Sequence, residues 1–321
     1  MKKWFLIILN IILVLLIIIF LKWVFTPLFE KNVVVLSPLP QFLSLIKNDQ
    51  VTSLSLWNPS FDSIWALIEK KPDVRARSAL LYDLTSKKIL FSKDMAKKLP
   101  MASLTKIMTA IVALEHQKDN DQYLVSANDL VGENSMGLTP GEILPLKDLL
   151  YGTILLSGND AAEVLASNYK EGRDAFIKAM NDKAKSLGLT NTSFTNPTGL
   201  QGDGDQYTTA YDLLVITNYA LSNFPAFREV AATFQRTIDQ NSTHKSYYLE
   251  NDTNLLTSYP GVKGVKTGFT PEAGLCLVTY LEYGGHKIIG VLLGSENRRD
   301  EMKEMLNYGL LIQGITPPKT P

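Results

Sequence analysis

Two parts of the chain have the pattern of β-hairpins, with largely apolar runs of strand length on either side of a short polar turn. Residues 78–84 and 89–92 flank the polar turn Thr85-Ser-Lys-Lys, and residues 275–282 and 287–293 flank Tyr283-Gly-Gly-His. A pair of glycines between such runs is a strong hairpin signal, because tight turns need positive φ angles that glycine adopts freely. We therefore expect paired strands at both ends of the globular part of the chain.

Between the two hairpins, apolar residues recur every three or four positions, which is the spacing of helices that bury one face. The pattern predicts helices over residues 104–116, 146–156, 160–170, 173–187 and 209–222, and one more over 298–313. Strands at both ends with helices between them favour an α+β fold, in which the N- and C-terminal strands pair in one antiparallel sheet covered by a helical cluster.

An almost continuous apolar run opens the chain from Trp4 to Leu21, preceded by two lysines. About 20 apolar residues span a bilayer. A cleavable signal peptide would be followed by small residues, but no Ala, Gly or Ser occurs before Ser37. We expect residues 4–25 to form an uncleaved single-pass anchor in the cell membrane, with residues 1–3 in the cytoplasm and the remainder on the extracytoplasmic side.

A proline-interrupted segment, residues 26–75, follows the expected anchor. It contains the apolar positions Phe61, Ile64, Trp65 and Ile68, spaced as on one face of a short helix. We therefore expect a stalk that packs partly on the domain or the membrane, and a globular domain over residues 76–321.

The composition argues against several classes of function and site. The 321 residues carry 32 basic and 32 acidic side chains, and no basic tract is interleaved with aromatics, which argues against nucleic-acid binding. The single cysteine, Cys276, excludes an internal disulfide and a multi-cysteine metal site. The three histidines are not spaced as metal ligands, so we expect no metal.

A serine and a lysine one helical turn apart could be a nucleophile and its base. No histidine lies near a G-x-S-x-G elbow, so lysine is the candidate base. The S-x-x-K spacing occurs at four places, which are Ser44/Lys47, Ser103/Lys106, Ser167/Lys170 and Ser242/Lys245.

Lysine serves as a base only if burial or a second cation lowers its pKa. Only the Ser103/Lys106 pair opens a long apolar helix, whereas Ser167/Lys170 and Ser242/Lys245 lie in polar surroundings. The serine would then lie at a helix N-terminus, where backbone N–H groups favour developing negative charge. Lys106, three residues on, would point into the domain.

Two further motifs support this choice. Ser157-Gly-Asn159 forms a turn before an apolar helix, although Ser126-Ala-Asn and Ser295-Glu-Asn share its spacing. Lys266-Thr267-Gly occurs once, before the C-terminal hairpin. A lysine and a threonine on a strand edge, with a glycine that permits close approach, suit binding of a substrate carboxylate. Lys266 would also be the second cation that lowers the pKa of Lys106.

In the order S-x-x-K, S-x-N and K-T-G, these motifs resemble the signature of penicillin-binding proteins and serine β-lactamases. The sequence most resembles the low-molecular-weight serine-type D-alanyl-D-alanine carboxypeptidases of peptidase family S11, over about residues 79–309. Other segments that resemble this family are Asn196-Pro-Thr-Gly-Leu, Tyr207-Thr-Thr-Ala and Thr253-Asn-Leu-Leu. The resemblance implies a β-lactamase/transpeptidase-like fold, with an antiparallel sheet flanked by helices and a helical subdomain.

The resemblance also implies a role for each motif. Ser103 would attack the carbonyl between two terminal D-alanines of a peptidoglycan stem peptide, with Lys106 as base and Ser157 as proton relay. Substrate binding would fall to Asn159, to Lys266 and Thr267 at the terminal carboxylate, and to the backbone N–H of Phe269, which with that of Ser103 would form the oxyanion hole. No cofactor is implied, and β-lactams are expected inhibitors.

Three alternatives remain at this stage. A D,D-endopeptidase carries the same motifs. A β-lactamase of the common class would need a glutamate in an E-x-x-x-N loop, and Glu250 matches by spacing but lies too close to Lys266 in sequence. A non-catalytic peptidoglycan-binding scaffold would be expected to lose Ser103 or Lys106, and both are present.

Overall fold

The computed structural model describes residues 71–253 and 255–320. At its centre is a five-stranded antiparallel sheet in the order β2-β1-β9-β8-β7. The predicted pairing of the N- and C-terminal strands is confirmed, since β1 hydrogen-bonds to β9 with Leu80 opposite Val291. The strands are β1 (Ser78–Asp83), β2 (Lys88–Lys93), β7 (Val262–Thr270), β8 (Gly274–Tyr283) and β9 (His286–Ser295).

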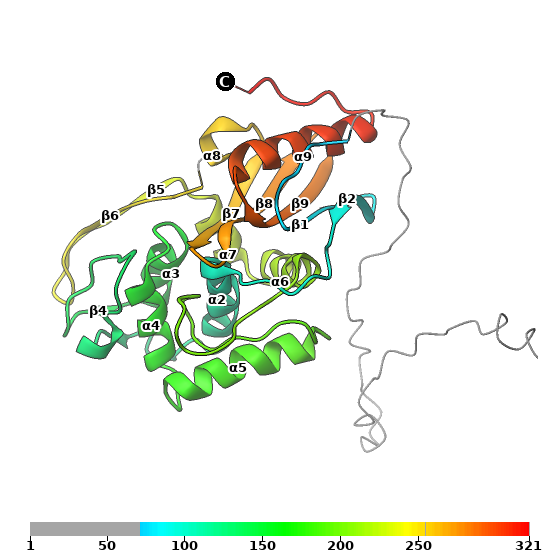
Figure 1. The fold of residues 1–321 in the computed structure, drawn as a ribbon. Helices are drawn as coiled ribbons and strands as arrows, with labels where there is room; N and C mark the ends of the chain where they lie inside the picture. Colours follow the sequence, from blue (N-terminus) through cyan, green and yellow to red (C-terminus); the bar gives the residue numbers. More distant parts are fainter. Residues whose placement is uncertain (1–70, 254, 321) are drawn as a thin grey trace, which may run out of the picture. The chain divides into compact units, whose positions relative to one another are not determined.

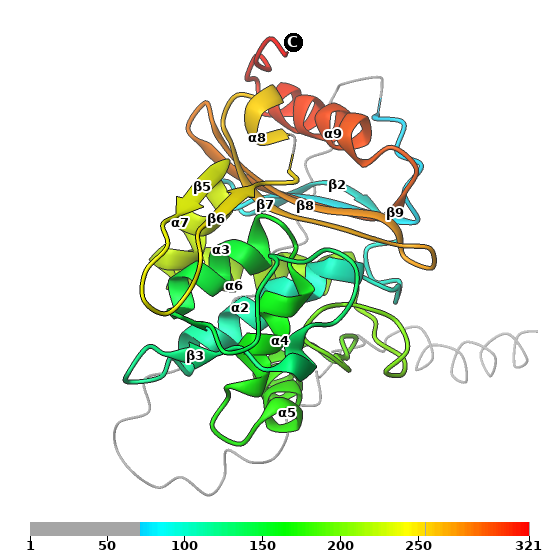
Figure 2. The same cartoon turned by 90° about the vertical axis from the view of Figure 1, so that its left-hand side faces the viewer.

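The two faces of the sheet belong to two separate cores. Leu80 and Tyr82 of β1 pack with the helices on one face, whereas Ala79 and Leu81 pack against α9 (Arg298–Ile312) on the other. Successive side chains of a strand point to opposite faces, so a strand buried on both sides reads as the continuous apolar run seen in β1. Figure 2 shows α9 on one side of the sheet, and α2 and α6 on the other.

On the face of the sheet opposite α9, the helices surround α2 (Thr105–Glu115), whose residues from Thr105 to Ala113 are all buried. A helix buried on every side is central to its layer, as Figure 1 shows for α2. The six predicted helices all form, with ends within three residues of those expected. Besides α2 and α9 these are α3 (Leu146–Ile154), α4 (Asn159–Ser167), α5 (Arg173–Ser186) and α6 (Ala210–Asn223).

Several smaller elements were not anticipated from the pattern. They are the helices α7 (Pro225–Ala232) and α8 (Leu255–Ser258), the 3-10 turns η2 (Ala102–Leu104) and η3 (Ala127–Asp129), and the two-stranded pairs β3 (Tyr123–Leu124) with β4 (Ile143–Leu144) and β5 (Gln235–Ile238) with β6 (Tyr247–Glu250). Among them, η2 carries the candidate nucleophile.

The predicted anchor, residues 4–25, and residues 26–70 of the predicted stalk lie outside the described residues. In the part of the chain that is described, no helix combines the length and hydrophobicity needed to cross a membrane. The last residues of the predicted stalk pack on the domain: Val74 is buried in the α9 core, and its carbonyl accepts a hydrogen bond of 2.8 Å from Lys93 Nζ.

Candidate active site

Ser103 lies in η2, which leads directly into α2. Ala102, immediately before it, has a φ of +49°, a left-handed conformation that alanine rarely adopts. The Leu104 N–H donates to the Met101 carbonyl over 3.2 Å and closes the turn. Such conformational strain costs about 1–3 kcal/mol per residue and often occurs at functional sites. The turn leaves Ser103 half-buried just before the helix.

Two glycines allow neighbouring segments to approach the Ser103 turn. A Cβ atom on Gly199, whose φ is +87°, would lie 2.0 Å from the Ala102 carbonyl oxygen. A Cβ atom on Gly268 would lie 3.1 Å from the Ser103 backbone nitrogen. Gly268 belongs to β7, one of the two edge strands of the sheet. The glycine of K-T-G thus lies close to the backbone of the Ser103 turn, and its predicted close approach to a substrate stays a prediction.

The Lys106 side chain is fully buried, and its amine reaches Ser103. Nζ lies 3.0 Å from Ser103 Oγ, 2.7 Å from Asn159 Oδ1 and 2.6 Å from the Thr198 carbonyl oxygen. The last two atoms can only accept hydrogen bonds. A neutral amine has two N–H donors and one lone pair, so donation to these two acceptors turns the lone pair towards Ser103 Oγ. The geometry thus orients Lys106 to take the proton of Ser103.

The surroundings of Lys106 favour its neutral form. Burial lowers the pKa of Lys106 well below its ordinary value, and the positive charge of Lys266 lowers it further. The carboxylates of Glu163 and Asp160 act in the opposite direction on this pKa. Burial disfavours charge and a second cation repels the added proton. A lysine base needs burial or a second cation to lower its pKa, and both are present at Lys106.

Ser157 and Asn159 lie at the start of α4. Ser157 is buried with a φ of +61°, and Asn159 is the first helical residue. Asn159 Oδ1 accepts from Lys106, while its Nδ2 donates to the carbonyls of Gly132 (3.1 Å) and Glu133 (2.8 Å). The amide is thus fixed at both ends, which suits the predicted holding of Lys106. Its predicted contact with substrate stays a prediction.

Lys266, Thr267 and Phe269 all lie on β7, so the predicted strand edge is confirmed. The side chain of Lys266 is buried, and its Nζ donates to the Thr267 carbonyl over 3.1 Å. The side chain of Phe269 is 61% exposed. β7 pairs with β8 along one edge, and its other edge faces the Ser103 turn. The predicted substrate-binding residues and the predicted nucleophile therefore share one site.

Sequence reasoning missed two contributions to this site. The Asn196-Pro-Thr-Gly run, interpreted as a structural turn, supplies the Thr198 carbonyl that binds Lys106. Arg298, at the start of α9, donates through Nη1 to the Gly268 carbonyl over 2.9 Å. Burial lowers the pKa of Lys266; the Asp252 carboxylate opposes this shift, and the charge of Arg298 adds to it. A backbone carbonyl leaves no trace in the side-chain pattern, so the first contribution could not be found from sequence.

A half-buried serine, a buried amine aimed at it and a second cation on an adjacent strand define a serine enzyme of the acyl-transfer class. Comparison with known proteins places the chain within that class. A family model described as D-alanyl-D-alanine carboxypeptidase matches residues 66–297. The chain belongs to this D-alanyl-D-alanine carboxypeptidase family.

Relatives and solved structures agree with this assignment. The chain is 36% identical to a D-alanyl-D-alanine carboxypeptidase of Bacillus subtilis over 73% of its length, and it spans 61% of the length of that relative. Identity to a carboxypeptidase of Streptomyces sp. K15 is 34% over 75% of this chain and 89% of the relative. The solved structure of the Streptomyces K15 DD-transpeptidase matches with a TM-score of 0.69 and 32% identity, covering 75% of this chain and 99% of that chain. This likeness confirms the predicted transpeptidase-like fold.

The rate of substrate capture is expected to fall on the alkaline side of neutrality. Burial lowers the pKa of Lys266 to about 7. A lysine is cationic below its pKa and neutral above it, so the cation available to a substrate carboxylate is lost as the pH rises through about 7. Measurement of kcat/KM against pH should show a falling limb there. Lys266→Arg, which stays charged, should move that limb to higher pH; a limb that does not move contradicts the role of Lys266.

Proposed function

We propose that this protein is a serine-type D-alanyl-D-alanine carboxypeptidase that removes the terminal D-alanine from peptidoglycan stem peptides through an acyl-enzyme on Ser103. The observation that carries the proposal is the Lys106 amine, buried and 3.0 Å from Ser103 Oγ. Family membership supports the same reading. β-Lactams should acylate the same serine, and a solved structure similar to this chain is that of Listeria monocytogenes penicillin-binding protein D2 in an ampicillin-bound form.

In the first step, Lys106 Nζ accepts the proton of Ser103 Oγ, which attacks the carbonyl carbon between the two D-alanines. The negative charge that develops on the carbonyl oxygen is stabilised by the backbone N–H groups of Ser103 and Phe269. One such donor typically contributes about 2.7–4 kcal/mol. The position of Gly268 beside the Ser103 nitrogen keeps these two backbone segments close together.

In the second step, the tetrahedral intermediate collapses and the C–N bond breaks. The departing D-alanine amine takes a proton that passes from Lys106 through the Ser157 hydroxyl. Lys266 and Thr267 hold the terminal carboxylate of the substrate during this step. Water then attacks the ester carbonyl of the acyl-enzyme while the neutral Lys106 accepts its proton. The ester C–O bond breaks, Ser103 Oγ takes the proton back from Lys106, and the shortened stem peptide is released.

A D,D-endopeptidase is the second candidate, because the chain is also 36% identical to a D-alanyl-D-alanine endopeptidase of Escherichia coli over 66% of its length. The test is incubation of the full chain in detergent with a pentapeptide ending in D-Ala-D-Ala and, separately, with cross-linked muropeptide dimers. Release of free D-alanine from the pentapeptide supports the carboxypeptidase. Cleavage of the dimers alone would favour the endopeptidase, and hydrolysis of neither by folded protein would contradict both.

We also propose that residues 4–25 anchor the protein in the cell membrane, with the catalytic domain on the extracytoplasmic side. The support is the apolar run from Trp4 to Leu21. Full-length protein should stay in the membrane fraction after an alkaline wash and dissolve only in detergent. Replacing both Leu13 and Leu16 by arginine, each costing about 2.5–3.5 kcal/mol at a helix centre, should release it. Wild-type protein in the soluble fraction would contradict the anchor.

A further inference from the structure

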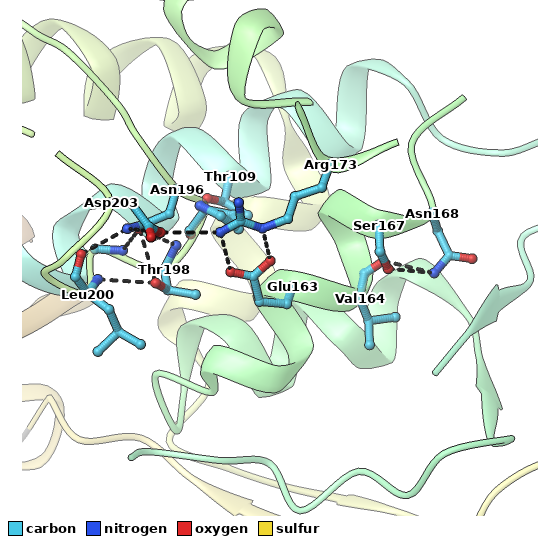
Figure 3. Close-up of polar contacts among 12 residues, drawn as sticks. Thr109, Glu163, Val164, Ser167, Asn168, Arg173, Asn196, Thr198, Leu200 and Asp203 are labelled. Carbon is cyan, nitrogen blue, oxygen red and sulfur yellow. Dashed lines mark hydrogen bonds and ion pairs between the residues drawn. The ribbon is translucent and has the colours of Figure 1, made fainter. Parts of the chain in front are cut away.

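Glu163, Arg173 and Asp203 form a chain of charged side chains that the mechanism above does not use (Figure 3). Arg173, the first residue of α5, binds Glu163 of α4 through two hydrogen bonds, from Nε over 2.6 Å and from Nη2 over 3.0 Å. The same Nη2 lies 3.4 Å from Asp203 Oδ2. The Glu163 side chain is 5% exposed, so Arg173 compensates a carboxylate that is removed from water.

The chain continues from Asp203 to the turn that supplies a partner of Lys106. Asn196 Nδ2 donates to Asp203 Oδ2 over 3.1 Å. Asn196 Oδ1 accepts from the backbone N–H groups of Thr198 (3.2 Å) and Gly199 (2.8 Å). These contacts fix the turn in which the Thr198 carbonyl points at Lys106 Nζ.

The other end of the chain leads to the second partner of Lys106. Glu163 lies four residues after Asn159 on α4, so the two side chains share one face of that helix. Arg173 therefore connects the helix that carries Asn159 with the loop that carries Thr198. These two residues supply the acceptors that turn the lone pair of Lys106 towards Ser103.

We propose that Arg173 is a positioning residue for the Lys106 base: by bridging Glu163 and Asp203 it fixes both acceptors of the lysine amine and neutralises the buried Glu163 carboxylate that faces it. The inference rests on the proposed acyl-transfer function. Arg173 touches neither Ser103 nor the expected substrate position, so it acts through Glu163 and the 196–203 loop.

Charge neutralisation matters because three charged groups face Lys106. Lys266 approaches from β7, and Asp160 and Glu163 approach from α4. The Asp160 carboxylate accepts hydrogen bonds from the backbone N–H groups of Met136 (2.8 Å), Gly137 (2.9 Å) and Leu138 (3.0 Å). Glu163 is balanced by Arg173. Without Arg173, the unpaired Glu163 charge would favour the ammonium form of Lys106, which cannot accept a proton.

The test measures the second-order rate of acylation by a fluorescent penicillin as a function of pH, using the full chain in detergent. The rate should rise with pH as Lys106 loses its proton. Arg173→Met should move this rising limb of the pH–rate profile about one pH unit upward, so that acylation at a pH on the limb is about tenfold slower. Glu163→Gln should move the limb downward. In the double variant Glu163→Gln/Arg173→Met the two shifts should largely cancel. Arg173→Lys should restore much of the wild-type profile.

A merely structural role would give a different result. If Arg173 only supports packing, Arg173→Met and Glu163→Gln would lower the rate at every pH and leave the limb in place, which would overturn the inference. The matched control is Glu115→Gln, which breaks the partly buried Lys183–Glu115 ion pair of 2.7 Å between the C-terminal ends of α5 and α2. It should not move the limb.

Two further outcomes are distinguishable. If Arg173→Met fails to fold, Glu163→Gln alone tests the inference. The rising limb of its pH–rate profile must then lie at lower pH than that of wild type, and an unmoved limb overturns the inference. Wild-type protein that is folded but is not acylated at any pH would instead contradict the proposed function.

Discussion

Replacing Lys106 by methionine is expected to abolish acylation of Ser103 while the protein stays folded. Methionine fills a similar volume but cannot accept the Ser103 proton. Removal of the catalytic base of a serine hydrolase lowers kcat by about 10⁶-fold in a well-studied case, and we expect a loss of at least about 10⁴-fold here. The measurement is the rate of D-alanine release together with covalent labelling by a fluorescent penicillin.

The chain contains a matched control for this substitution. Ser167 and Lys170 have the same spacing as Ser103 and Lys106, but Lys170 is exposed in the loop after α4. Lys170→Met should therefore leave acylation within about twofold of wild type, as expected for surface substitutions away from a site. Full activity of Lys106→Met would rule out Lys106 as the base.

Replacing Gly199 by alanine is expected to damage the site without touching a side chain of the mechanism. The added Cβ would lie 2.0 Å from the Ala102 carbonyl oxygen and 3.0 Å from the Ser103 nitrogen. The surrounding backbone must move, and with it the Thr198 carbonyl and the nucleophile turn. Misplacement by 1 Å can cost about 10²-fold in rate, so we expect acylation to fall by roughly that factor. Thermal unfolding should show a loss of about 1–3 kcal/mol.

The control variant Gly188→Ala distinguishes the effect of this close contact from the effect of backbone strain. Gly188 also has a positive φ, +77°, but nothing lies within 4 Å of its would-be Cβ. The control should lose stability of about 1 kcal/mol or somewhat more from the unfavourable φ and keep its acylation rate. Equal acylation rates in Gly188→Ala and Gly199→Ala would contradict the importance of the approach of Gly199 to the Ser103 turn.

Much of the fold follows from the periodicity of the sequence. β1, β8 and β9 are largely apolar runs bounded by clear turn residues, and α2 is mostly apolar and long enough to show its period, so both types of element are strongly specified. The pattern did not predict α7, because this helix is short and follows α6 directly, although Pro225 at its first turn is a helix-start signal. The pairs β3–β4 and β5–β6 are too short to show a period.

The candidate site was predictable where side chains carry the chemistry. Ser103, Lys106 and Lys266 could be selected because a lysine base requires burial or a second cation, and the structure brings these three together. The Thr198 carbonyl could not be selected, because every residue has one and only tertiary structure aims it. Arg173, at the start of α5, pairs with Glu163 in the middle of α4, and no local pattern indicates that pairing.

Identification of the acylated residue tests the central claim most directly. Full-length protein in detergent would be incubated with benzylpenicillin, digested, and mapped by mass spectrometry, beside Ser103→Ala and the matched Ser167→Ala. We predict one stable adduct on the peptide that contains Ser103, present in wild type and Ser167→Ala and absent from Ser103→Ala. An adduct that persists in Ser103→Ala, or no adduct on folded wild-type protein, would contradict an acyl-transfer site built on Ser103 and Lys106.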